Sequence, residues 1–363
     1  MEDIQFIDTR DGAEQAARVL AAEPFIAIDT EFVREKTYHP LPCLLQIAGA
    51  GQIFCLDLIA LEGSAALTDV LMDRKVTKVL HSARQDLELF YALIGAVPGP
   101  VYDTQIAAAL LGFPDQAGYG NLVNQVLDIE LEKGHARTDW SRRPLSPEQL
   151  RYAADDVRYL VPLYQTLRQR LESRARSDWP DADFQALEDA RLYTPDPDSA
   201  WSKVKGWRQL QGAALARLQR LAAWREEIAV ARNRPRRWIL ADDVLMGLAA
   251  RAPADEAAIT NLGIVPPAVL RRYARDLIER LAMDSDQSTS EPTPDTRLSR
   301  SETTLLGRLG KYVDRRAEEA EIAPSMIATR AELKRMVCGD RDLPVLKGWR
   351  REIAGDALLG LLD

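Results

Sequence analysis

Apolar residues follow two different patterns along this chain, and the change between them divides it. In the first half, short apolar runs typical of strands alternate with segments whose apolar residues recur at helical spacing. Gly49-Ala50-Gly51 separates two of the runs as a hairpin turn does. The pattern therefore predicts an α/β domain with a mixed sheet. We expect strands over 25–31, 44–48, 52–57, 77–80 and 101–102, and helices over 11–22, 64–73, the stretch after Ser82, and 104–111.

Capping residues predict where two helices begin. Ser82 follows the strand over 77–80 and is a plausible N-cap for the next helix. Ser146-Pro147-Glu148-Gln149 opens another helix, which we expect to run to about Ser173. The first domain is therefore predicted to span residues 1–173. Residues 174–205 are polar, contain one possible helix at 182–192, and are interpreted as a connector.

From about residue 206 the pattern is helical throughout. We expect helical domains over 206–283 and 305–363, joined by a disordered-type linker at 284–304. The two domains resemble each other at an offset of 88 residues, which indicates a duplicated helical module. Chance matching of two helical patterns is the alternative. The matched positions are Leu221, Trp224, Ala229, Ile239 and Leu245 opposite Leu309, Tyr312, Ala317, Ile327 and Leu333.

Composition limits where the protein works. The chain has 363 residues, of which 46% are hydrophobic and 28% charged, and no apolar run is long enough to span a membrane. The first residues lack the basic segment and apolar core of a signal peptide. The cysteines, Cys43, Cys55 and Cys338, form no CxxC pair and give no complete disulfide framework. A cytoplasmic location, without a membrane partner, is the prediction.

The distribution of charge points to a polyanionic partner. The net charge is −8, but residues 201–283 contain 15 basic and 8 acidic residues, a local charge of +7. Residues 1–200 contain 19 basic and 32 acidic residues, a local charge of −13. Local charge determines contact with phosphate. An acidic body joined to a basic module is what a metal-dependent nuclease with a separate binding domain needs.

A buried strand that ends in two acids is the first candidate site. Asp29 and Glu31 are two residues apart on the strand that begins at Phe25, so both side chains project to the same side. Two carboxylates held side by side repel each other unless a cation lies between them. Oxygen ligands suit Mg²⁺ or Mn²⁺. The alternative is a strand end that reaches solvent with both acids exposed.

A later helix adds an acid and a tyrosine. Tyr152 and Asp156 lie one turn apart on one helix face, whereas Asp155 points about 100° away. Asp86, early in its own helix, is a fourth acid, although an acid there often only compensates the helix dipole. Four carboxylates could hold two divalent ions about 3.5–4 Å apart. Tyr152 would then orient the attacking water.

Other residues are candidates for substrate contacts. Thr30, Phe32 and His81 lie beside the acids in sequence, and an aromatic face such as that of Phe32 stacks on bases. Core packing and structural hydrogen bonds are the alternatives. Arg232, Arg234, Arg236 and Arg237 surround Trp238 in the basic domain, a combination that suits phosphate contact and stacking. Arg137, Arg142 and Arg143 flank Trp140 and are weaker candidates for the same role.

These motifs resemble a known family. Ile28-Asp29-Thr30-Glu31-Phe32, His81 to Leu87 and Tyr152 to Leu160 resemble the three exonuclease motifs of the DEDD superfamily, and Tyr152 places the resemblance in its tyrosine branch. The segments Asp103 to Ala107, Gly118 to Val123 and Thr138 to Leu145 are similar to the ribonuclease D family. The helical domains resemble HRDC domains, the first more closely than the second.

The resemblance implies a fold, an activity and a partner. It implies a ribonuclease H-like 3′-to-5′ exoribonuclease that releases nucleoside 5′-monophosphates and trims the 3′ ends of tRNA precursors and other small structured RNAs. It implies two divalent ions, Mg²⁺ or Mn²⁺, on Asp29, Glu31, Asp86 and Asp156, with Tyr152 at the water. No obligate protein partner is inferred. The alternatives are a DNA 3′-5′ exonuclease and an inactive RNA-binding scaffold.

Overall fold

A computed structural model describes residues 4–61, 64–132, 134, 138–283 and 298–362. The chain forms two compact units. Unit 1 contains the chain up to Val33, the stretch Pro42–Tyr193 and the C-terminal helices. Unit 2 contains Arg34–Leu41 and the helices between Thr194 and Asp295. None of the described helices is both long enough and apolar enough to cross a membrane.

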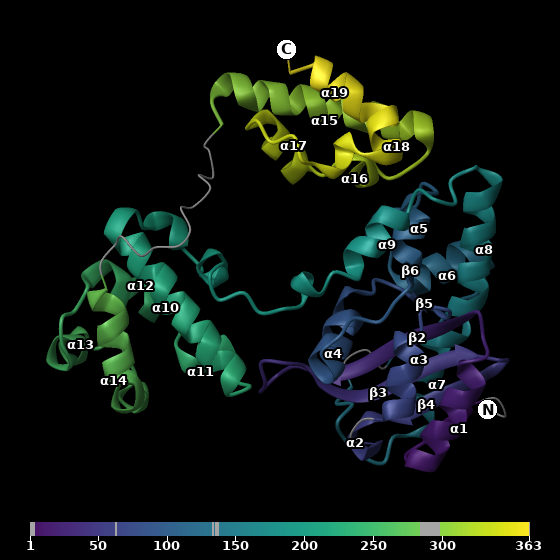
Figure 1. Ribbon diagram of the computed structural model, residues 1–363, viewed down its shortest axis with the longest axis horizontal. Coiled ribbons are helices and arrows are strands. Elements are labelled where there is room, and N and C mark those ends of the chain that lie inside the picture. The colour runs from purple at the N-terminus through teal and green to yellow at the C-terminus, as the bar shows by residue number, and fades with distance from the viewer. Residues whose placement is uncertain (1–3, 62–63, 133, 135–137, 284–297, 363) are drawn as a thin grey trace. The chain divides into compact units, whose positions relative to one another are not determined.

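A six-stranded mixed sheet forms the centre of unit 1 (Figure 1), in the order β1-β4-β3-β2-β5-β6. The β3–β4 pair is antiparallel, and β1–β4, β2–β5 and β5–β6 are parallel. The predicted mixed sheet is therefore confirmed, and its first strand is one that the apolar pattern missed. The strands are β1 (Ile4–Ile7), β2 (Phe25–Val33), β3 (Leu41–Gly49), β4 (Gln52–Asp57), β5 (Thr77–Leu80) and β6 (Val101–Asp103).

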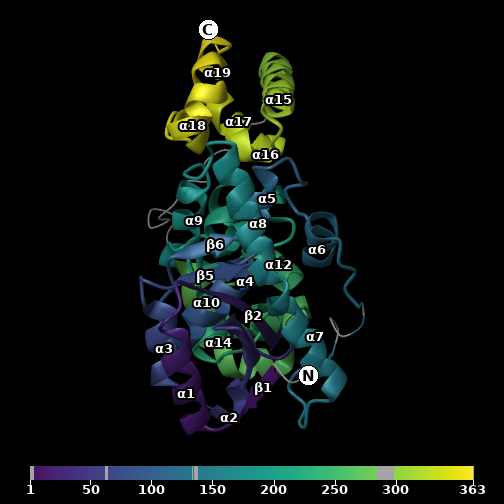
Figure 2. The same cartoon turned by 90° about the vertical axis from the view of Figure 1, so that its right-hand side faces the viewer.

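Helices cover both faces of the sheet. Figure 2 shows α1 and α3 on one side of the strands and α7 on the other. Ile26 and Ile28 of β2 pack in the apolar core beneath α1, whereas Ala27 packs in the core beneath α7 and α8. This alternation directs the odd-numbered residues of β2 toward α7. The helices are α1 (Arg10–Leu20), α2 (Leu58–Leu61), α3 (Ala65–Met72), α4 (Arg84–Ile94), α5 (Thr104–Ala109), α6 (Tyr119–Leu127), α7 (Pro147–Arg158) and α8 (Leu160–Ser173).

The start of α4 differs from the prediction. Ser82 is not its N-cap, because Ser82 has a left-handed φ of 58° and the helix begins at Arg84 without a side-chain cap of its own. Asp103, at the end of β6, supplies the missing acceptors. Its carboxylate accepts the backbone N–H groups of Ser82 at 3.0 Å and of Ala83 at 2.8 Å. A carboxylate from a neighbouring strand therefore fixes the turn that carries Asp86.

The segment after α8 packs on the sheet domain. The helix predicted to run to Ser173 is two helices, which meet at Tyr159. Beyond them, α9 (Asp181–Leu187) places Phe184 in the apolar core, and a carboxylate oxygen of Glu188 accepts the backbone N–H of Val101 at 2.9 Å. Unit 1 continues to Tyr193, so the first part of the 174–205 segment is built into this unit.

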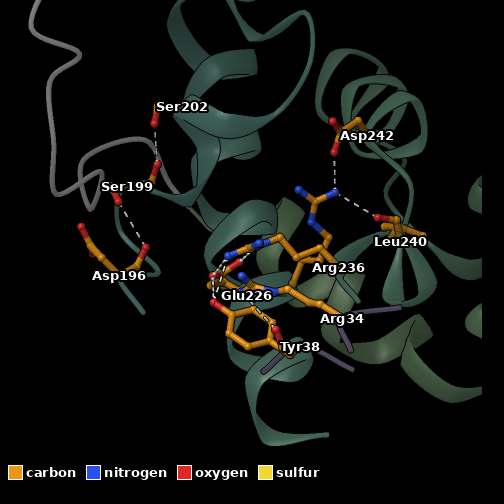
Figure 3. A network of polar contacts seen from close by, with 10 residues as sticks. Arg34, Tyr38, Asp196, Ser199, Ser202, Glu226, Arg236, Leu240 and Asp242 are labelled. Atoms are coloured by element: carbon orange, nitrogen blue, oxygen red, sulfur yellow. Dashed lines mark hydrogen bonds and ion pairs between the residues drawn. The ribbon is translucent and has the colours of Figure 1, made fainter. Parts of the chain in front are cut away.

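Unit 2 is a helical module that includes the loop between β2 and β3. Tyr38 of that loop is buried in the core of the module, and its hydroxyl donates to Glu226 (Figure 3). The side-chain oxygen of Asn233 accepts the backbone N–H groups of Tyr38 and His39 at 3.0 Å. The helices are α10 (Gly212–Ala231), α11 (Arg236–Ile239), α12 (Asp242–Arg251), α13 (Glu256–Leu262) and α14 (Pro267–Ala282).

The C-terminal helices repeat the start of that module at the predicted offset. Three helices of the C-terminal module each begin 88 residues after their counterparts in unit 2. They are α15 (Arg300–Ala320) after α10, α16 (Pro324–Ile327) after α11, and α17 (Arg330–Val337) after α12. The chain then forms α18 (Gly348–Arg350) and α19 (Asp356–Gly360). This register supports a duplication. Residues 284–297 of the predicted linker lie outside the described residues, and its last residues already belong to α15.

Candidate active site

Three carboxylates from two elements converge at one point. Asp29 and Glu31 come from β2 and Asp156 from α7, and one ligand oxygen from each lies within 4.8 Å of the others. The strand alternation explains two members, because residues two apart face the same way, here toward α7. The third member comes from the helix that covers this face. The structure therefore brings together three of the four acids that the sequence singled out.

Asp86 lies beside this group and is joined to it through Thr30. Asp86 is buried in the first turn of α4, and the Thr30 hydroxyl donates to its carboxylate at 2.5 Å. Thr30 is itself buried, with 6% of its surface exposed. As an even-numbered residue of β2, Thr30 faces α4 and its hydroxyl orients Asp86, so contact of Thr30 with substrate stays a prediction.

The two neighbouring aspartates of α7 have different surroundings. Asp156 belongs to the acidic group, whereas Asp155 accepts a hydrogen bond from the Arg158 guanidinium at 2.9 Å. Tyr152, one turn before Asp156, is half-buried beside the indole of Trp140, with 6.2 Å between ring centroids. The helical geometry therefore directs Tyr152 and Asp156 to the same place, as their spacing predicts.

Burial and mutual repulsion raise the pKa values of this group. Burial, followed by the charges of Asp29, Asp156 and Asp86, raises the pKa of Glu31 to about 9. Burial and the charge of Asp155 raise the pKa of Asp156 to about 7. Burial, then the charge of Asp156, raises the pKa of Asp29, and burial, then the charge of Asp29, raises that of Asp86. Each acid thus makes its neighbours harder to ionise.

The group fits divalent metal ions. Its donors are carboxylate oxygens, which suit hard cations such as Mg²⁺ and Mn²⁺. The charges that raise the pKa of Glu31 are those of the other acids. A buried cluster of like charges is costly unless protons or cations neutralise it, and cations restore the charged form of every member.

A cavity of about 820 Å³ opens beside Tyr152 and Asp156. One wall is Gly118 to Asn121 at the start of α6, where the Tyr119 hydroxyl donates to the backbone carbonyl of Asp155 at 2.9 Å. This wall was missed as a candidate site, although the segment was noted as a family motif. The remaining lining residues are Asn124, Glu130, Leu131, Glu132, Gly134, Glu148, Arg151 and Asp155.

His81 is held by structural hydrogen bonds. Its Nδ1 lies 3.0 Å from the Thr104 hydroxyl, and its Nε2 lies 2.9 Å from the backbone carbonyl of Ala117. Burial lowers the pKa of His81. These hydrogen bonds give His81 a structural role, and its contact with substrate stays a prediction. Phe32 is half-buried on β2, and its contact with substrate stays a prediction.

The arginines near Trp238 divide into two kinds. Arg236 forms an ion pair with Glu226 and lies over the ring of Tyr38, 4.8 Å from its centroid, so its guanidinium holds the module together (Figure 3). Arg232, Arg234 and Arg237 are exposed. Two of them, with Trp238, line a cavity of about 530 Å³ together with Ile239, Ala268, Val269, Arg272 and Tyr273.

The sequence pattern missed Arg272 and Tyr273, which lie on α14. The Arg232 and Arg272 guanidinium carbons lie 5.4 Å and 5.7 Å from the centroid of the Tyr273 ring. We call the surface formed by Arg232, Arg234, Trp238, Arg272 and Tyr273 the basic groove. It combines positive charge with aromatic faces, the two features that single-stranded nucleic acids require.

The arginines around Trp140 have structural partners. Arg143 forms an ion pair with Asp57 at 2.6 Å and donates to the backbone carbonyl of Cys43 at 2.8 Å, which corrects its interpretation as a backbone contact of RNA. Arg142 donates to Asp139 at 3.1 Å. Arg137 lies outside the described residues.

Comparisons with known proteins agree on one family. A family model described as 3′-5′ exonuclease matches residues 4–172, and an HRDC domain model matches residues 214–281. Ribonuclease D of Gluconacetobacter diazotrophicus is 38% identical over 95% of this chain and 89% of its own. Ribonuclease D of Pseudomonas paraeruginosa is 37% identical over 99% of this chain and 98% of its own. The crystal structure of Escherichia coli RNase D, described as an exoribonuclease involved in structured RNA processing, has a TM-score of 0.84 at 28% identity, covering 99% of this chain and 98% of that one.

Proposed function

Because the chain belongs to the ribonuclease D family of 3′-to-5′ exoribonucleases, we propose that it trims the 3′ ends of tRNA precursors and other small structured RNAs in the cytoplasm. The observation that supports this most strongly is the convergence of Asp29, Glu31 and Asp156 beside a cavity of about 820 Å³. An RNA 3′ end entering the cavity would meet Tyr152 and Asp156, at the edge of the acidic group.

The acids are proposed to hold two divalent ions, Mg²⁺ or Mn²⁺. Asp29, Glu31 and Asp156 would provide one cluster of ligands, and Asp86 would join them as the fourth carboxylate. When bound, such a pair neutralises charge on the attacking and leaving oxygens of an in-line phosphodiester displacement. The role of the protein is to hold the carboxylate oxygens of the four acids in place. The Thr30 hydroxyl does this for Asp86.

Tyr152 is proposed to orient the attacking water. Burial, followed by the charges of Asp156, Glu31 and Asp29, raises the pKa of Tyr152 above its ordinary value. The phenol therefore keeps its proton at neutral pH and is unsuited to be a general base. Its hydroxyl can still form directed hydrogen bonds at the edge of the acidic group. Positioning of the nucleophile is thus the role that its surroundings favour.

We predict that Tyr152→Phe lowers kcat by about 10- to 1,000-fold and leaves the Kd for RNA nearly unchanged, because only a positioning hydroxyl is lost. The phenyl ring keeps the packing against Trp140. Single-turnover rates and RNA binding at neutral pH measure the two effects. Tyr159→Phe, next to the junction of α7 and α8, is the matched control and is expected to keep the wild-type rate. A wild-type rate for Tyr152→Phe would contradict the role in orienting water.

The basic groove is proposed to hold the body of the RNA. Its residues come from the module with a local charge of +7, in a chain whose first 200 residues carry −13. Arg234 and Trp238 are exposed, and 53% of the Trp238 surface is accessible. Guanidinium groups contact phosphates, and the indole provides a stacking face. The module would therefore compensate for repulsion between RNA and the acidic first half.

We predict that Arg234→Gln combined with Arg272→Gln weakens RNA binding and flattens its salt dependence, because each lost phosphate contact lowers the salt slope by about 0.7–0.9. Arg251→Gln, which removes one positive charge from an exposed position at the end of α12, is the control for each single substitution and should leave the slope within error. RNA affinity measured against salt concentration provides the comparison. Equal slopes for both proteins would exclude the basic groove as a phosphate-binding surface.

One assay tests the activity against its alternatives. Matched single strands of RNA and DNA, labelled at the 5′ end, are incubated with Mg²⁺ or with excess chelator. We expect stepwise shortening of RNA from the 3′ end, release of nucleoside 5′-monophosphates, and no shortening in chelator. Faster shortening of DNA would favour a DNA exonuclease. Binding of RNA without any shortening would favour an inactive scaffold.

A further inference from the structure

Equivalent positions of the two helical modules carry side chains of different chemistry. At the offset of 88 residues, Arg232, Arg234 and Trp238 of the first module correspond to Ala320, Ile322 and Met326 of the second. Both sets lie where the long first helix ends and the next short helix begins, α10 to α11 and α15 to α16. Two cations and an indole on one module are thus replaced by apolar side chains on the other.

In the first module these positions are exposed. Arg232, Arg234 and Trp238 line the basic groove, and their side chains contribute charge and an aromatic face to it. In the second module Ile322 packs in the module's own apolar core, and Met326 packs on the sheet domain. Met326 has 8% of its surface exposed and packs in the apolar core that lies between the sheet and α5 to α8, together with Ala323. At the position shared by Trp238 and Met326, an exposed indole of the first module is therefore replaced by a side chain of the docking face in the second.

Backbone hydrogen bonds fix this docking face to the end of α5. The Ala323 N–H donates to the carbonyl oxygen of Ala109 at 2.8 Å. The Arg176 guanidinium donates both to the Leu110 carbonyl at 3.1 Å and to the Ala320 carbonyl at 2.7 Å, so one side chain joins the two segments. These bonds involve the main chain of both segments.

A second set of contacts joins the same module to α9 and the segment before it. The indoles of Trp179 and Trp349 stack with 4.4 Å between centroids and 2° between planes, and the Trp349 N–H donates to the Trp179 carbonyl at 2.8 Å. Arg350 donates two hydrogen bonds to the Asp183 carboxylate, at 2.8 Å and 2.7 Å. Both bonds come from one guanidinium nitrogen, and Nε of Arg350 donates to the backbone carbonyl of Met326 at 2.5 Å, so this partly buried side chain joins α9 to α16 and helps to orient the module on this surface.

The segment that is held in this way leads into the active-site cavity. Ala109 and Leu110 precede a turn in which Gly112 has a φ of 93°, and a Cβ there would lie 3.0 Å from the Glu321 carbonyl oxygen. The chain continues to Ala117, whose carbonyl bonds His81, and then to the cavity wall Gly118–Asn121. Only a glycine satisfies both the left-handed backbone and the close approach of Glu321.

We propose that the C-terminal helical module is a brace for the active-site wall, attached through the face that carries the basic groove in the first module. By holding residues 109–112, the module limits the movement of Gly118–Asn121 beside Tyr152 and Asp156. Its docking residues are positioning residues. The brace itself follows from the contacts of unit 1, and only the contrast with an RNA-binding face depends on the proposed function.

A matched pair of substitutions tests the brace. Met326→Glu places a charge in the docking face, and Trp238→Glu places the same charge at the corresponding position of the first module. We expect Met326→Glu to speed hydrogen exchange at residues 109–121 by about tenfold or more, because local opening becomes easier. It should also raise KM for a short RNA without changing the salt slope of binding. Trp238→Glu should weaken RNA binding and leave exchange at residues 109–121 unchanged.

A second variant distinguishes loss of the docking contact from misfolding of the C-terminal module. Asp183→Asn removes the charged partner of Arg350 from the α9 side and leaves the core of the C-terminal module untouched. It should speed exchange at residues 109–121 in the same direction, by a smaller factor, while exchange within α15 stays as in the wild type. Unchanged exchange at residues 109–121 in both variants would overturn the brace. Unchanged RNA binding in Trp238→Glu would instead count against the RNA role of the basic groove.

Discussion

Asp156→Asn is expected to lose about 100-fold or more of the exonuclease rate, equivalent to about 2.7 kcal/mol of transition-state stabilisation, whereas Asp155→Asn keeps most of it. The two residues are adjacent and the two substitutions are chemically the same. Asp156 shares the acidic group with Asp29 and Glu31, but Asp155 forms an ion pair with Arg158. Single-turnover rates on a short RNA measure the difference.

Stability provides the control for that comparison. Because folding raises the pKa of Asp156 to about 7, its charged form is disfavoured in the fold, and it costs stability above its ordinary pKa. Removing the charge should therefore leave the free energy of unfolding of the metal-free protein at pH 8 equal or higher. Asp29→Asn should behave in the same way. An inactive Asp155→Asn beside an active Asp156→Asn would show that the wrong face of α7 has been identified.

Local spacing was sufficient to predict most of the strands and the direction of the acids in β2 and α7. The mixed sheet follows from short apolar runs and from the hairpin turn, since both signals act over a few residues. The strand alternation placed Asp29 and Glu31 together, and the helical repeat placed Tyr152 with Asp156. β1 was missed because it has four residues and its partner in the sheet, β4, lies about fifty residues away.

The corrections concern partners that are distant in sequence. The Tyr38 hydroxyl that accepts from Arg236 is 198 residues away in the chain, and the carboxylate of Asp57 that binds Arg143 is 86 residues away. Asp103, on another strand, replaced Ser82 as the acceptor for the start of α4. No local pattern contains these pairs, because they form only when the fold brings the segments together.

The position of Thr30 follows from a rule that was applied only to its neighbours. Thr30 was a candidate for substrate contact because it lies between Asp29 and Glu31 in sequence, yet the same alternation that unites the two acids turns the residue between them to the opposite face. Its hydroxyl accordingly meets Asp86 on α4. The strand period, applied to every residue of the motif, predicts that Thr30 faces away from the two acids that are proposed to bind metal.

Removal of divalent ions is expected to abolish activity and to destabilise the protein more at high pH than at low pH. In the metal-free protein the pKa of Glu31 is about 9 and that of Asp156 about 7, against ordinary values of 4.5 and 3.8. At any pH between a group's ordinary pKa and its raised pKa, the folded protein keeps a proton on that carboxyl group that the unfolded protein has lost. The free energy of unfolding of the metal-free protein must therefore fall as pH rises through this window.

Divalent cations bind the deprotonated carboxylates, so their affinity rises as protons leave. A ligand at 100 times its Kd stabilises the folded state by about 2.7 kcal/mol, and a lower Kd at higher pH increases that gain at fixed Mg²⁺. Thermal unfolding with Mg²⁺ and with excess chelator should therefore show a difference in Tm that widens from pH 6 to pH 9. Asp155→Asn, which lies outside the acidic group, should keep the widening, and Asp156→Asn should reduce it. A constant difference in Tm across this range, or RNA shortening in excess chelator, would contradict metal binding by these acids, because proton release from Glu31 and Asp156 is what links the ion to pH.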